Sequence, residues 1–203
     1  MEQPMRAKLS ILILLVAMAV PALGGASVLQ LDPKTTRVTF ELPATGHDVE
    51  GVVGLERGEV DFDPASGAAS GEIVLDAAGA ETGNGSRDKT MRQDVLDVLQ
   101  FPTIRFLPAK IVGTVPERGA GAVTLHGIIE LHGAQHPLAL PARVTVENGV
   151  VAAEATFQIP YQDWGLHDPS VLFLRVARIV EVTVHAKGTL APGAPGAASP
   201  AAR

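Results

Sequence analysis

Apolar and polar residues alternate along most of this chain, which is the pattern of a β-strand with one buried face. RVTFEL (37–42), for example, places Val38, Phe40 and Leu42 on one side. Similar alternation recurs in the segments 59–63, 70–76, 103–115, 122–133, 142–159 and 171–188. We expect about eight to ten strands with hairpin-like links. Because no strand–helix–strand rhythm appears, the sequence predicts an all-β, antiparallel barrel or sandwich.

Two local signals refine these strands. Asn148-Gly149 divides the segment 142–159, because this dipeptide favours the tight turn of a β-hairpin. Pro108 interrupts the segment 103–115. Since proline has no N–H to donate to a ladder, we expect an edge or a bulge there.

GNGSRDKTMRQDVLDVLQFPTIRF (83–106) departs from the alternation. Ser86 is the expected N-cap of a helix, and Pro102 stops that helix. Between them, apolar residues recur at helical spacing, at Met91, Val95 and Val98. The sequence therefore predicts one short amphipathic helix over 87–99, packed against an apolar surface.

The two ends of the chain differ from its middle. Residues 1–26 combine Arg6 and Lys8 with a short apolar run and a small-residue stretch, which is the pattern of a cleaved secretory signal peptide. The apolar run is too short to span a bilayer. Residues 190–203 are rich in Ala, Gly and Pro, and we expect a disordered tail. The folded domain is then 27–189, in a periplasmic or secreted protein.

Composition excludes several classes of function. The 203 residues include 16 Lys or Arg and 22 Asp or Glu, with a net charge of −6. No basic stripe is present, so a nucleic-acid partner is not expected. The acidic balance also argues against electrostatic docking on anionic lipid. The absence of cysteine excludes thiol nucleophiles, thiolate metal sites and iron–sulfur clusters.

Three histidines occur close together in LHGIIELHGAQHPL (125–138). His126, Glu130 and His132 share the polar face of the expected strand. A strand rises about 3.3 Å per residue, so these side chains are too spread out to surround one ion. No metal site is therefore expected, and a metal-dependent hydrolase that uses the histidines of 126–136 is kept as an alternative.

The apolar faces of this hairpin also predict its register. Pairing Leu131 with Leu138 and Ile129 with Leu140 brings apolar residues together across the two strands. In that register His136 does not lie on the polar face.

Ser86 and Lys89 have the S-x-x-K spacing of some serine acyl-enzymes. The second serine motif and the K-T-G sequence that accompany this spacing in those enzymes are missing. A helix cap explains Ser86 better. The chain also lacks a Gly-rich phosphate loop, an H-E-x-x-H motif and a nucleophile elbow, so we expect no enzymatic activity.

Several stretches carry a resemblance to a known family. They are GNGSRDKTMRQDVLDVLQFPTIRF, AVTLHGIIELHGAQHPLAL, LDPKTTRVTFEL with GEVDFDPASGAASGEIVLD, and IPYQDWGL. They resemble, respectively, the G-N-x-x-R-D block, a hairpin, the first strands and a late segment of the YceI family of bacterial polyisoprenoid-binding proteins, and along the chain they occur in the same order as in the family. The match covers about residues 30–188. The resemblance implies an extended antiparallel, lipocalin-like β-barrel of about eight strands with a helix near one end, exported to the periplasm. It also implies non-catalytic binding or transport of a polyisoprenoid, an isoprenoid quinone or a similar amphiphilic lipid.

Apolar side chains are placed to line such a barrel, and the candidates are Phe40, Phe62, Phe106, Leu125, Phe157, Trp164 and Phe173. Arg87 and Arg92 are candidates for holding a polar head group, since an apolar tunnel needs only a few polar groups to fix orientation. The resemblance implies no cofactor. The expected partners are the lipid, a membrane or membrane protein that donates or accepts it, and a second copy of the chain paired through an exposed edge strand.

Two segments depart from the commoner family pattern, TGHDVEG (45–51) and the DWG that replaces D-F-G at 163–165. If these segments line the tunnel, the identity of the ligand is the first property they change.

The apolar residues that are candidates for lining the barrel would also fill a solid core. A packed structural or stress-related envelope protein is therefore a second alternative.

Overall fold

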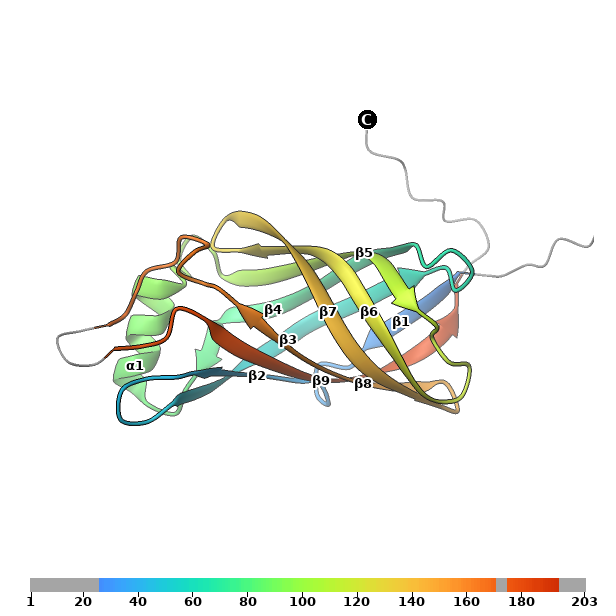
Figure 1. Cartoon of the computed structure of the whole chain (residues 1–203), viewed down its shortest axis with the longest axis horizontal. Coiled ribbons are helices and arrows are strands. Elements are labelled where there is room, and N and C mark those ends of the chain that lie inside the picture. Colours follow the sequence, from blue (N-terminus) through green and yellow to red (C-terminus); the bar gives the residue numbers. More distant parts are fainter. Residues whose placement is uncertain (1–25, 171–174, 194–203) are drawn as a thin grey trace, which may run out of the picture.

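The computed structural model describes residues 26–170 and 175–193, which form an elongated antiparallel β-barrel with a short helix at one end (Figure 1). Pairing between β3 and β4 closes the ring of strands. The predicted lipocalin-like all-β barrel with one short helix is confirmed. In chain order the elements are β1 (Ser27–Leu31), β2 (Arg37–Leu42), β3 (Val49–Phe62), β4 (Ala69–Glu81), α1 (Gly85–Thr90), η1 (Met91–Val95), β5 (Thr103–Gly113), β6 (Gly119–Leu131), β7 (Ala134–Glu147), β8 (Val150–Ile159) and β9 (Val180–Pro192).

The strands fill eight positions because β1 and β2 share one, both lying between β3 and β9. Between β1 and β2 the chain leaves the ladder in a turn held by Asp32. Its carboxylate accepts hydrogen bonds from the N–H of Lys34 at 2.9 Å and from the hydroxyl of Thr35 at 3.0 Å. These two hydrogen bonds hold the pKa of Asp32 below its usual value.

The helix begins earlier than the sequence predicts. Asn84, not Ser86, is the N-cap, since its side-chain oxygen accepts hydrogen bonds from the N–H groups of Ser86 and Arg87, at 3.1 Å each. Asn and Ser are about equally good caps, so residue type alone could not decide between them. The cap at Asn84 lets the helix start at Gly85 instead of residue 87.

The helix also ends earlier than predicted, in a widened π-helical turn. The N–H of Leu96 donates to the carbonyl oxygen of Met91, five residues back, at 2.8 Å. Asp97 then adopts a left-handed backbone, with φ 45°. Because the widened turn ends the helix, the residues after it no longer lie on the apolar face of the helix. Val95, within the turn, is buried, whereas Leu99, after it, is 90% exposed. The predicted helix end at residue 99 was therefore wrong.

The local turn and bulge signals are confirmed. Asn148 and Gly149 both have left-handed backbones, with φ 51° and 77°, and they join β7 to β8. The register between β5 and β6 shifts between Pro108 and Lys110, as expected of a bulge at this proline.

The β6–β7 hairpin differs from its predicted register. Its turn consists of His132 and Gly133, with φ 51° and 75°. Ile129 consequently pairs with His136 rather than with Leu140. A two-residue turn determines hairpin register, and matching apolar residues does not show where that turn lies. The prediction that His136 lies off the polar face is confirmed.

The last strand begins later than the alternation suggests. β9 starts at Val180, and the preceding residues 175–179 lie outside it. The N–H of Ala177 instead donates to the carbonyl oxygen of Pro43, beyond the end of β2, at 2.7 Å. β9 then continues to Pro192, past the expected domain end at residue 189.

The buried core lies inside the barrel. The larger cluster, at the helix end, comprises Val38, Val95, Phe106, Ile129, Leu131, Ile159, Tyr161, Leu166 and Val182. A smaller cluster comprises Leu31, Leu55 and Ala186. In the described ranges, no helix has the length and apolar character needed to cross a membrane.

Gly127 in β6 leaves no room for a side chain. A Cβ atom there would overlap the carbonyl oxygen of Leu107 and lie 2.6 Å from the ring of Phe106. Gly127→Ala is therefore expected to lower the free energy of unfolding by about 1–3 kcal/mol, the usual cost of overpacking. Gly54→Ala in β3, where a Cβ meets nothing within 4 Å, is the control and should change it by less than about 0.5 kcal/mol. Urea denaturation measures both, and equal stability of the two variants would contradict the close approach of β6 to β5.

Candidate functional site

The inward-facing residues of β2 to β9 form an almost continuous apolar surface. One row, for example, runs from Phe40 in β2 through Val182 in β9 to Phe157 in β8. Apart from His136, the residues paired into these inward rows are aliphatic, phenylalanine, proline or glycine. The barrel interior is therefore suited to an apolar ligand or an apolar core.

The structure gathers most of the predicted lining residues. One cluster contains Phe40, Phe106, Leu125, Phe157 and Trp164. Phe62 is buried, but it lies at the opposite end of the barrel, where β3 pairs with the start of β1. Phe173 lies outside the described residues.

Inward side chains in the middle of the barrel keep some accessible surface. Leu138 and Leu140 in β7, and Ala155 and Phe157 in β8, are half-buried although they face inward. Farther along β7, towards the end away from the helix, Val144 is buried. The far end is thus more tightly filled than the middle, where apolar side chains remain available for contact with a ligand.

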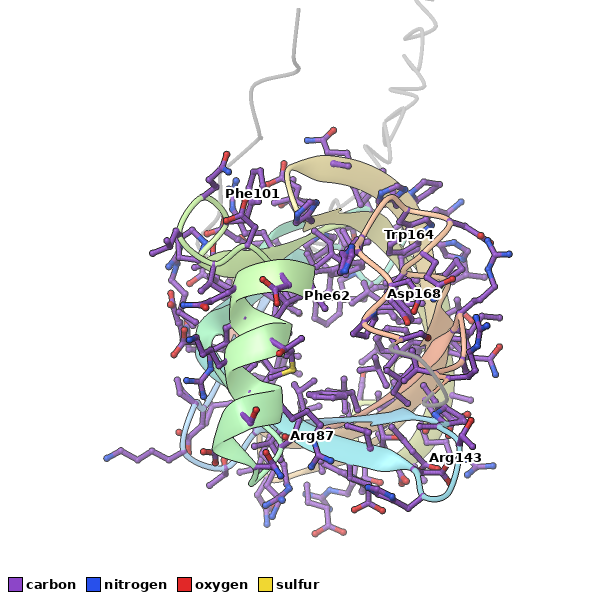
Figure 2. All side chains as sticks on the ribbon, turned by 90° about the vertical axis from the view of Figure 1, so that its left-hand side faces the viewer. Phe62, Arg87, Phe101, Arg143, Trp164 and Asp168 are labelled. Carbon is purple, nitrogen blue, oxygen red and sulfur yellow. The ribbon has the colours of Figure 1, made fainter. Side chains whose placement is uncertain are left out.

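Figure 2 looks along the barrel from the helix end, with α1 on one side of the opening and the turn that carries Trp164 and Asp168 on the other. Hydrogen bonds fix this turn. The hydroxyl of Tyr161 donates to the carbonyl oxygen of Ala177 at 2.9 Å and accepts from Nε2 of Gln162 at 3.1 Å. Burial raises the pKa of Tyr161, against the effect of the Gln162 hydrogen bond, so the hydroxyl stays protonated at neutral pH.

Trp164 covers the imidazole of His136. The two rings are stacked, with centroids 4.1 Å apart and planes inclined by 2°. Nε2 of His136 is buried and has no hydrogen-bond partner in the part of the chain that the structure describes. Sequence reasoning missed this pair, because a contact between the β8–β9 connection and β7 leaves no local pattern.

Arg87 and Arg92, the predicted head-group residues, hold the helix to the end of β4. Nε and Nη2 of Arg87 donate to the hydroxyl and the carbonyl oxygen of Thr82, at 2.8 and 3.0 Å. Nε of Arg92 donates to the carbonyl oxygen of Ala80 at 2.8 Å. Both guanidinium groups therefore position α1 and η1 at the opening of the barrel.

The other two histidines of the β6–β7 hairpin lie elsewhere. His126 is exposed on the outside of β6, and His132 in the turn packs against Phe101, with ring centroids 4.9 Å apart. Across residues 26–170 and 175–193, no three His, Asp or Glu side chains are close enough together to hold a metal ion. The geometry gives no support to the alternative of a metal-dependent hydrolase.

A groove of about 520 Å³ lies on the outside of the barrel, over β2, β3 and β9. Glu41 faces Glu50 in β3 and Glu181 in β9, and Glu81 also lines the groove. Carboxylates opposite one another on neighbouring strands repel. This acidic surface does not suit an apolar ligand, in contrast to the interior.

Comparison with known proteins gives a family and a fold. A family model described as YceI-like domain matches residues 29–188. The structure of Burkholderia cenocepacia BcnA has 18% identity and a TM-score of 0.64, with 78% of this chain and 99% of that chain covered. A polyisoprenoid binding domain from Saccharophagus degradans, implicated in plant cell wall breakdown, has 13% identity and a TM-score of 0.59, with 79% and 97% covered. A Campylobacter jejuni YCEI protein has 17% identity and a TM-score of 0.50, with 68% and 85% covered. No curated protein matches the sequence.

Asp88 also ties the helix to β4. Its carboxylate accepts hydrogen bonds from the hydroxyl and the N–H of Thr82, at 2.5 and 2.7 Å. The Thr82 hydrogen bonds, together with the nearby charges of Arg92 and Arg87, hold the pKa of Asp88 below its usual value, although burial acts in the opposite direction. Such a carboxylate stabilises the folded protein at pH values above the pKa that it has in the unfolded chain. This stabilisation is lost as the pH falls through the pKa that it has in the folded protein.

We therefore expect the stability of the wild type to fall below about pH 4 in part through Asp88. Asp88→Asn has no carboxylate to protonate there, so its free energy of unfolding should fall less between pH 7 and pH 3. Asp94→Asn, at an exposed position of η1, is the control and should follow the wild type. Urea denaturation at the two pH values measures the difference. An unchanged pH dependence in Asp88→Asn would contradict this role.

Proposed function

Because the chain belongs to the YceI-like domain family, we propose that it is a non-catalytic carrier that holds an amphiphilic lipid inside its barrel. The observation that carries this proposal is the apolar inner surface, which stays partly accessible in the middle of the barrel. One similar structure is that of a polyisoprenoid binding domain. A polyisoprenoid or an isoprenoid quinone is therefore the ligand class that we propose.

The physical chemistry of the interior supports this ligand class. A barrel of about eight strands is wide enough to hold one small ligand. Burial of apolar surface contributes about 25 cal/mol per Å², and an elongated prenyl chain presents such surface along its whole length. Rows such as Phe40, Val182 and Phe157 offer matching apolar contacts. The outer acidic groove offers none of comparable extent.

We also propose that the protein acts in the periplasm. The support is the signal-peptide pattern of residues 1–26, with its basic start, short apolar run and small-residue stretch. A prenyl lipid is poorly soluble in such an aqueous compartment. A barrel that encloses the chain would shield it from water between a donor and an acceptor membrane or membrane protein.

The first test is to export the chain in a bacterial periplasm, purify it without detergent and extract it into organic solvent. Mass spectrometry of the extract should find one prenyl lipid at close to one molecule per protein. An extract without any lipid, together with no binding of added prenyl lipids, would overturn the carrier proposal and favour a packed barrel.

Ala155 provides a more specific test, because it faces inward between Ala142 of β7 and Val184 of β9. Ala155→Phe adds a ring to the middle of the barrel and should weaken prenyl-lipid binding by about tenfold or more, given the usual cost of overpacking. Ala139→Phe adds the same ring to the exposed outer face of β7 and should bind like the wild type.

The affinity of both variants is measured by titration with geranylgeraniol. The signal is the fluorescence emission of Trp164, the single tryptophan. Circular dichroism and urea denaturation verify that each variant folds. Equal binding by the two folded variants would contradict a ligand site inside the barrel.

A further inference from the structure

His136 is the one polar side chain in the inward rows of β2 to β9 in the described part of the chain. It pairs with Ile129, which is 6% exposed, so its side chain points to the same face as that core residue. Leu138 and Leu140 follow it along the inner face of β7. The strand partner of this imidazole and the residues that follow it along the inner face of β7 are apolar.

The ring of His136 stacks on Trp164, and its Nε2 is buried and unsatisfied. Trp164 stacks on it at a centroid distance of 4.1 Å, while Nε2 is buried without a hydrogen-bond partner among the described residues. A buried polar atom of this kind is costly unless something bonds to it, and unpaired cases in native proteins are rare. Nε2 of a neutral imidazole can donate or accept one hydrogen bond.

We propose that Nε2 of His136 is the polar subsite of the lipid cavity, where it hydrogen-bonds an uncharged oxygen, a hydroxyl or a carbonyl, at one end of the ligand. This inference rests on the proposed carrier function. The stack with Trp164 fixes the ring plane and covers one face of it. The remaining apolar chain of the ligand then runs along the half-buried residues Leu138, Leu140 and Phe157.

The charge of the surroundings selects an uncharged oxygen over an anionic group. The inward rows contain no lysine or arginine in the described strands β2 to β9. Arg87 and Arg92 bond to Thr82 and Ala80 at the end of β4. An ion in such an apolar interior would have no partner of opposite charge, and burial without one is strongly unfavourable.

The position of His136 also orients the ligand. It lies three residues after the turn residue Gly133, at the helix end of the barrel, whereas Val144 and Val146 on the same strand are buried at the far end. The oxygen-bearing end of the lipid therefore lies at the helix end of the barrel, beside Trp164. The apolar end extends towards the far end of the barrel.

A competition between two probes tests the subsite. The purified protein is incubated with equal amounts of geranylgeraniol and of its deoxygenated hydrocarbon, and the bound ratio is read by mass spectrometry after extraction. The wild type should prefer the alcohol by roughly tenfold, the range expected for satisfying a buried polar atom. His136→Phe, which keeps a ring to stack on Trp164, should bring the ratio close to one. Because both probes share the same chain, changes in packing affect them alike.

Two further variants complete the design. His126→Phe, on the outside of β6, should keep the wild-type ratio. His136→Gln, which restores a hydrogen-bonding group, should retain part of the preference and serves if His136→Phe does not fold. A full wild-type preference in folded His136→Phe would overturn the subsite while leaving the carrier function intact, and so would an undiminished preference in His136→Gln if His136→Phe does not fold. Failure of the wild type to bind either probe would overturn the carrier function itself. Tighter binding of geranylgeranyl phosphate than of the alcohol would overturn the assignment to an uncharged oxygen.

Discussion

Closure of the barrel by hydrogen bonds between β3 and β4 is the constraint on which the other features depend. Closure forces alternate residues of every strand into one interior, where they must be apolar or individually satisfied. The same pairing is irregular, with a register shift between Val52 and Gly54. There the residues 77–80 of β4 bulge, and the N–H of Ala78 donates to the carbonyl oxygen of Pro102 at 3.2 Å. The helix docks at this bulged end, because Arg92 bonds to Ala80 and Arg87 bonds to Thr82. The closure thus determines both the apolar interior and the place of the helix.

The face of most strand residues could be predicted from the sequence, but the register could not. Alternation alone assigns inward and outward residues, and it placed Phe40, Phe106 and Phe157 correctly inside. The predicted partner of Ile129 was Leu140, and its actual partner is His136. The two partners are separated by an even number of residues along β7. Since side chains alternate with a period of two, such a shift leaves every residue on its predicted face. The turn at His132-Gly133 determines the register.

The parts of the site that escaped prediction depend on contacts distant in sequence or on small local differences. The roles of Arg87 and Arg92 follow from the bulged end of β4, which no periodicity reveals. The widened turn at Val95 ended the helix early, although the apolar stripe continues in the sequence. The stack of Trp164 on His136 joins segments that belong to different strands and connections. Its sequence signal was limited to a lone tryptophan and a histidine on an apolar face.

A single imidazole in an apolar interior limits what the site can do chemically. General acid–base catalysis needs a group within hydrogen-bond reach of the reacting proton, and an activated nucleophile needs an adjacent base. In the described inward rows, His136 has Ile129 opposite it and Leu138 beyond it, with no carboxylate, hydroxyl or second imidazole among them. Tyr161 has its hydroxyl bonded to Ala177 and Gln162, and burial raises its pKa. One unsatisfied nitrogen beside an indole can bond the polar end of a ligand and so orient it, as the proposed carrier function requires.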